Sequence, residues 1–98
     1  MEINSKEYWD NRFKSNDWIL AGGNNQNKYF YNVMLELIPN NIKEEIQNNS
    51  MSICDFGCAE GDGLEIFSKV FVNSEITGVD ISEHALINAR KKYIDINF

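Results

Sequence analysis

Residues 54–66, with the sequence CDFGCAEGDGLEI, place three glycines and one alanine within seven positions between two apolar runs. A strand that turns sharply into a helix needs a positive φ, which glycine adopts at little steric cost. Positions without bulky side chains also allow a ligand to lie directly on the backbone, beside the N-terminus of the following helix. A tight turn without a ligand would need fewer small residues. The stretch therefore predicts a strand, a ligand-binding turn and a helix in succession.

The segments on either side of this turn alternate between strand and helix patterns. SICDF (52–56) and SEITGVD (74–80) are compact runs typical of strands, and IDINF (94–98) resembles the beginning of a third strand. The spacing of apolar residues predicts helices over 64–71 and 82–93, the second with a serine as its N-cap. This βαβαβ order predicts an α/β fold with a parallel sheet and right-handed crossovers.

The N-terminal half contains helix patterns and no strand pattern. Asn4, in a capping pair with Glu7, is expected to open a first helix, and residues 15–26 are interpreted as an irregular segment. A second helix, which a proline ends, carries one continuous apolar stripe. The residues of the stripe are Phe30, Val33, Met34 and Leu37. We therefore expect a helical lead-in or lid over 1–49 and the start of an α/β domain over 50–98.

Charge and composition exclude several classes of partner. The net charge of −6 argues against a surface that binds nucleic acid or an anionic membrane. The N-terminus is too polar for a signal peptide, and no apolar run approaches the length that spans a bilayer. Cys54 and Cys58 are too few for a zinc site and are expected to be reduced thiols. The sequence thus predicts a cytoplasmic protein without a bound metal, and with neither nucleic acid nor membrane as its partner.

Spacing and charge narrow the choice of ligand at the turn. A phosphate-binding P-loop needs a lysine after its glycines, and none is present. The small residues Gly57, Ala59 and Gly61 depart from the dinucleotide fingerprint, because the third comes one position early. Glu60 and Asp62 would repel a pyrophosphate and would suit a ligand that carries positive charge. S-Adenosylmethionine carries a sulfonium and an ammonium against one carboxylate, whereas an NAD-type dinucleotide, the cofactor of an oxidoreductase, stays open as the alternative.

The stretch DFGCAEGDG (55–63) followed by GVDIS (78–82) resembles motif I and the next acidic motif of class I S-adenosylmethionine-dependent methyltransferases. YWDNRF, WILAGG and YFYNVMLELIP resemble the leading helices of bacterial members of that superfamily. The similarity runs from about residue 5 to the end of the chain. It implies a Rossmann-like, doubly wound parallel sheet, of which this chain is the N-terminal part, with S-adenosyl-L-methionine as the cofactor of a methyl transfer.

The resemblance also implies roles for three side chains. Asp55, at the end of the first strand, would help to hold the amino group of the methionine part. Asp80, at the end of the second strand, would accept hydrogen bonds from both ribose hydroxyls. Ile81 would pack on the face of the adenine.

The turn itself would contribute mainly backbone. The resemblance implies that the backbone of Gly57, Cys58 and Gly61 wraps around the methionine and ribose parts of the cofactor. Ala59 stands where glycine is commoner, but its methyl group is small. Most residues that face the substrate follow the third strand in family members, beyond Phe98. The resemblance therefore assigns neither a catalytic residue nor the methyl acceptor, which would be a small molecule or another nucleophile.

A sheet of two or three parallel strands leaves an unpaired edge and apolar faces. We therefore expect the chain to be a fragment, truncated within the cofactor-binding domain, and inactive when isolated. Self-association through the open sheet edges is expected to follow. A non-catalytic binding module, completed by a partner chain, is the alternative of a different class.

Overall fold

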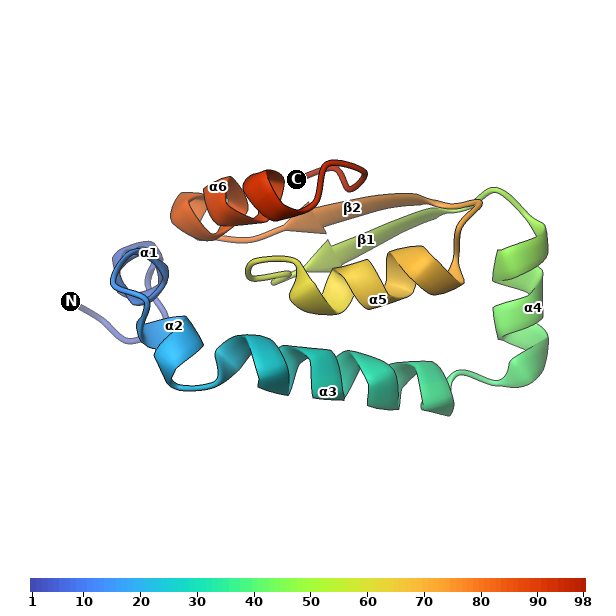
Figure 1. The fold of residues 1–98 in the computed structure, drawn as a ribbon, viewed down its shortest axis with the longest axis horizontal. Helices are drawn as coiled ribbons and strands as arrows, with labels where there is room; N and C mark the ends of the chain where they lie inside the picture. Colours follow the sequence, from blue (N-terminus) through green and yellow to red (C-terminus); the bar gives the residue numbers. More distant parts are fainter.

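Two parallel strands lie at the centre of the structure, a computed structural model that describes residues 1–98 (Figure 1). β1 (Ser52–Phe56) pairs with β2 (Glu75–Val79) in a register that places Ile53 beside Ile76. On the other edge of β2, the N–H of Asn97 donates to the carbonyl of Ile76. Both predicted strands are confirmed, and the predicted third strand begins as a single parallel bridge.

Helix α5 (Asp62–Val70) connects the two strands, and α6 (Glu83–Lys92) follows β2. The N-cap of α5 is Gly61, whose φ of 82° is left-handed and therefore favours glycine. At the start of α6 the hydroxyl of Ser82 accepts the backbone N–H of Ala85 at 3.1 Å, so the predicted serine cap is confirmed. From β1 onward the order of elements is thus strand, helix, strand and helix, as the periodicity of the sequence predicts.

Four helices precede the sheet. They are α1 (Lys6–Lys14), α2 (Asp17–Leu20), α3 (Gly23–Leu37) and α4 (Asn40–Asn48). The predicted cap at Asn4 is wrong, because Asn4 has a φ of 67° and Ser5 has the extended conformation that a cap needs. The hydroxyl of Ser5 accepts the N–H of Tyr8. The interpretation of 15–26 as irregular is also wrong, since α2 and the start of α3 lie there.

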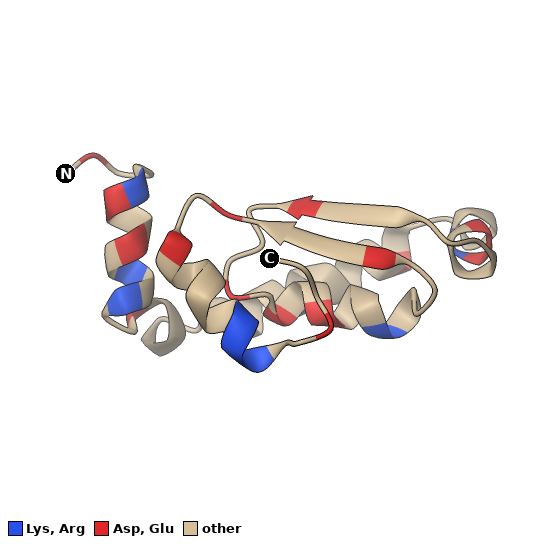
Figure 2. Cartoon of the chain, turned by 90° about the horizontal axis from the view of Figure 1, so that it is seen from above, with Lys and Arg blue, Asp and Glu red and all other residues tan.

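The helices that follow the strands cover one face of the sheet only. Figure 2 shows the strands along one side of the molecule and these helices on the other. The core under the covered face is formed by Cys58, Leu64, Ile76, Leu86 and Ile96. On the opposite face, Phe56 keeps 81% of its surface exposed and Val79 keeps 39%. The expectation of an apolar sheet face without cover is therefore confirmed.

Helix α3 packs on α5 through a different face from the one its apolar stripe predicts. Three residues of that stripe, Phe30, Met34 and Leu37, are exposed. The large side chain that α3 buries is Tyr31, whose ring lies directly on the α5 backbone because Gly63 has no side chain. A Cβ at that glycine would come within 2.3 Å of the ring, so only glycine allows this contact. No helix combines the length and apolar character that crossing a membrane requires.

Candidate functional site

A cavity of about 370 Å³ lies where the carboxyl ends of β1 and β2 meet the N-terminal helices. In open parallel sheets this edge is where ligands bind. Its lining joins two groups of residues, one from the turns after the strands and one from α1 and α2. The first group is Gly57, Ala59, Asp80 and Ile81, and the second is Trp9, Phe13 and Trp18. The structure thus brings together four of the residues that the sequence predicts for the site.

Three aromatic rings form the wall opposite the turns. Trp9 and Phe13 come from α1 and Trp18 from α2, and the rings of Phe13 and Trp18 lie 5.1 Å apart between centroids. Phe13 is buried against Ala59 and Ala85, so the same residues that line the cavity also attach α1 to the α/β part. Trp9 and Phe13 therefore both pack α1 against the α/β part and line the cavity.

The turn after β1 contains three residues with positive φ: Gly57 at 88°, Ala59 at 53° and Gly61 at 82°. The N–H of Gly57 donates to the carbonyl of Val79 at 2.7 Å, which joins the turn to β2. A Cβ added at Gly57 would meet no atom within 4 Å, so the position borders open space beside the cavity, and glycine leaves that space free. The left-handed φ of Ala59 costs roughly 1–2 kcal/mol, a cost that glycine would not have at this position.

Asp80 holds the two turns that border the cavity. One carboxylate oxygen, Oδ2, accepts the N–H of Ala59 at 2.9 Å, and the other, Oδ1, accepts the N–H of Ser82 at 2.9 Å. Because a carboxylate has about four acceptor positions, each oxygen keeps one for a further donor. The side chain is therefore held in place from both sides while it can still accept hydrogen bonds from a ligand.

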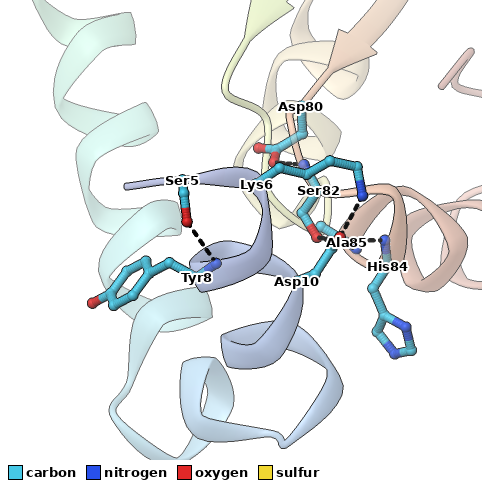
Figure 3. A network of polar contacts seen from close by, with 8 residues as sticks. All are labelled: Ser5, Lys6, Tyr8, Asp10, Asp80, Ser82, His84 and Ala85. Atoms are coloured by element: carbon cyan, nitrogen blue, oxygen red, sulfur yellow. Dashed lines mark hydrogen bonds and ion pairs between the residues drawn. The ribbon is translucent and has the colours of Figure 1, made fainter. Parts of the chain in front are cut away.

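A polar network attaches α1 beside this carboxylate (Figure 3). The hydroxyl of Ser82 donates to Oδ1 of Asp10 at 2.6 Å, and the N–H of His84 donates to the same oxygen at 3.3 Å. Hydrogen bonds from Lys6, Ser82 and His84 lower the pKa of Asp10 to about 2, against the opposing effect of burial. An anion at the N-terminus of α6 is also favoured by the helix dipole. Sequence reasoning identified Ser82 as a cap but missed its partner.

Three predicted residues lie outside the lining of the cavity. Asp55 accepts the hydroxyl of Tyr31, a contact that sequence reasoning missed. The thiol of Cys58 is buried, and burial together with Asp80 and Asp55 raises its pKa to about 12, which favours the protonated thiol. At Gly61 a Cβ would come within 2.7 Å of the ring of Phe98. Packing against that ring is therefore sufficient reason for glycine at this position.

The expectation that Glu60 and Asp62 select a cationic ligand is wrong. Both side chains are buried beside the last turns of α6, where Lys92 Nζ lies 3.0 Å from Asp62 and 3.6 Å from Glu60. Asn88 also donates to Glu60 at 2.6 Å. These contacts direct the two carboxylates away from the cavity, whose lining contains neither.

Two other carboxylates carry the negative charge at this edge of the sheet. Asp55 and Asp80 form no ion pair with any lysine or arginine, whereas Glu60 and Asp62 share Lys92. The charges of both carboxylates help to raise the pKa of the Cys58 thiol, which is buried in the core. A cationic group in a ligand would therefore find uncompensated negative charge here.

Comparison with known proteins identifies one family. A family model described as a methyltransferase domain matches residues 47–98. The matched range includes both strands, the turn between β1 and α5, and the segment that carries Asp80. No curated protein and no solved structure gives a match.

Proposed function

Because the chain belongs to the methyltransferase domain family, we propose that its cavity binds S-adenosyl-L-methionine and that the protein transfers a methyl group to an acceptor. The observation that carries this proposal is the placement of Asp80. Its carboxylate borders a cavity with an aromatic wall, is fixed by two backbone N–H groups and keeps acceptor positions free. A nucleoside, which combines an apolar base with two adjacent hydroxyls, matches these features.

The residues around the cavity fit the parts of this cofactor. Asp80 would accept the ribose hydroxyls, and Ile81, which is 55% exposed, would pack on the adenine together with Trp9. Gly57 would allow the ligand to approach the backbone closely. Asp55 would hold the amino group of the methionine part. The cofactor supplies a methyl group on a sulfonium, and the chain's own residues bind and orient it.

The proposal extends to the organisation of the chain. The parallel pair β1 and β2, with Asn97 on the outer edge of β2, would be one half of a Rossmann-like, doubly wound sheet. Residues 50–98 would then begin the cofactor-binding domain, and residues 1–49 would serve as its helical lead-in. The aromatic wall from α1 and α2 supports a lid role for this lead-in.

Calorimetry tests the proposed cofactor. We expect the chain to bind S-adenosylhomocysteine, which has the same nucleoside and amino acid parts, and not to bind NAD, because the turn departs from the dinucleotide spacing. Trp9→Ala removes part of the aromatic wall and should weaken the binding of S-adenosylhomocysteine. Binding of NAD without any response to S-adenosylhomocysteine would instead support the dinucleotide alternative.

A further inference from the structure

Tyr31 is held in a single position by its packing. Its side chain is 7% exposed, and its ring lies on the backbone of Gly63 and 5.4 Å from the ring of Phe67. From this position its hydroxyl donates a hydrogen bond to Oδ2 of Asp55. Burial and the neighbouring carboxylate of Asp55 raise the pKa of Tyr31, so the phenol stays protonated and neutral.

Asp55 differs from the other carboxylates of the turn in its partner. Glu60 and Asp62 lie within ion-pair distance of Lys92, whereas the only side chain that hydrogen-bonds Asp55 is the neutral phenol of Tyr31. A lysine in the position of that phenol would cancel the charge of the carboxylate. The phenol of Tyr31 instead fixes one oxygen of the Asp55 carboxylate and leaves its negative charge uncompensated. Both carboxylate oxygens keep acceptor positions free.

We propose that Tyr31 is a positioning residue, which orients the Asp55 carboxylate to bind the primary ammonium group of the cofactor. This inference rests on the proposed function, since it assigns a partner to one part of the same ligand. The contrasting interpretation is that the hydrogen bond only attaches α3 to β1. The two interpretations differ in one respect: orientation of Asp55 affects only ligands that carry the ammonium group.

Two ligands separate these interpretations. S-Adenosylhomocysteine carries the ammonium group, and 5′-methylthioadenosine has the same nucleoside and thioether without the amino acid. Tyr31→Phe removes only the hydroxyl and keeps the ring on Gly63. We expect it to weaken binding of S-adenosylhomocysteine by about three- to tenfold, part of the effect of one hydrogen bond to a charged group. Its affinity for 5′-methylthioadenosine should change by less than about twofold.

Tyr29→Phe is the matched control, because Tyr29 lies on the same helix, is 64% exposed and makes no hydrogen bond through its hydroxyl. It should leave both affinities unchanged. In an Asp55→Asn background, Tyr31→Phe should have no further effect on S-adenosylhomocysteine. Asp55→Asn alone should lower the preference for S-adenosylhomocysteine over 5′-methylthioadenosine, which provides a test even if Tyr31→Phe does not fold.

The outcomes distinguish the inference from the function on which it rests. Equal losses for both ligands, or no loss, in folded Tyr31→Phe would show that the hydrogen bond is only an attachment and would overturn the positioning role. An unchanged ligand preference in Asp55→Asn would overturn it as well. If the unmodified chain binds neither ligand, the proposed function fails first, and the role of Tyr31 fails with it.

Discussion

The carboxylate of Asp80 accepts one backbone hydrogen bond from each of the two turns that border the cavity. These bonds fix its orientation without a cationic partner, which suits the proposed role of Asp80 as an acceptor for the hydroxyls of a ligand. They also give Asp80 a second role, since its removal leaves the N–H groups of Ala59 and Ser82 without an acceptor. A loss of affinity in Asp80→Ala alone would therefore combine a local structural effect with a lost ligand contact.

Removing a hydroxyl from the ligand isolates the contact. We expect the unmodified chain to bind the 2′-deoxy analogue of S-adenosylhomocysteine more weakly than the parent by roughly 1–3 kcal/mol, since the half-buried Asp80 carboxylate, which the bound ligand would cover, loses a donor. Asp80→Ala should bind the two ligands equally, as measured by calorimetry. The control is Glu83→Ala, which removes an exposed ion pair with Arg90 and should keep the discrimination. Discrimination that persists in Asp80→Ala would show that another residue binds the ribose.

At the scale of elements, the attachment of α1 to α6 decides whether the cavity has a wall. Asp10 lies one residue after Trp9 and binds the first turn of α6 through Ser82 and His84. The same serine donates its N–H to Asp80. The aromatic wall and the Asp80 carboxylate are therefore linked through one residue, Ser82, so loosening α1 should expose the tryptophans and open the cavity.

This attachment should depend on pH. The pKa of Asp10 falls from 3.8 to about 2 in the folded chain, chiefly through its hydrogen bond from Lys6. A lowered pKa stabilises the folded form above pH 3.8, and that contribution is lost as the pH falls from 3.8 to about 2. We expect tryptophan fluorescence to report the release of α1 over this range.

Two variants separate Asp10 from the other carboxylates. Asp10→Asn should shift the tryptophan emission toward that of exposed indole already at neutral pH, because the amide cannot replace the charge beside Lys6 and the α6 dipole. Asp17→Asn is the control, since its exposed carboxylate makes no hydrogen bond. Identical acid titrations for the unmodified chain and Asp10→Asn would contradict a role for Asp10 in holding α1.

At the scale of the whole molecule, one face of the sheet has no covering helix. Cys54, Phe56 and Val79 are exposed there, while the helices that follow the strands lie on the opposite face. Parallel strands are usually covered on both faces, and an unpaired strand edge promotes pairing with another chain. The exposed side of β1 and β2 is therefore the surface through which we expect copies of the chain to associate.

Sedimentation over a range of concentrations tests this association. We expect the unmodified chain to associate as its concentration rises, and Phe56→Lys to shift the transition to at least about tenfold higher concentration, because burial of a phenylalanine contributes about 1.5–3 kcal/mol. Val72→Lys is the control, since Val72 is 74% exposed in the turn between α5 and β2. A monomer at every concentration would contradict self-association through the sheet.

Local patterns in the sequence predicted the α/β part well. The two strands, the left-handed turn at Gly57 and Gly61, and the cap at Ser82 each depend on residues within a few positions of one another. Backbone conformation and periodicity are properties of such short stretches, so the sequence contains the information directly. The prediction that Asp80 lies at the carboxyl end of the second strand, beside the turn, follows from the same strand assignment and parallel pairing; in the structure it directly follows β2.

The sequence by itself determined the order of strands and helices from residue 52 onward and the position of the left-handed turn after β1. Only the tertiary structure decided which partner each polar side chain meets. Tyr31 meets Asp55 across 24 positions and Asp10 meets Ser82 across 72, whereas Glu60 turns to α6 and not to the cavity. A carboxylate near a turn can bind a ligand or a lysine, and local sequence does not distinguish these. The choice depends on which helix lies alongside, which the packing of α3 on Gly63 and of α6 on the sheet determines.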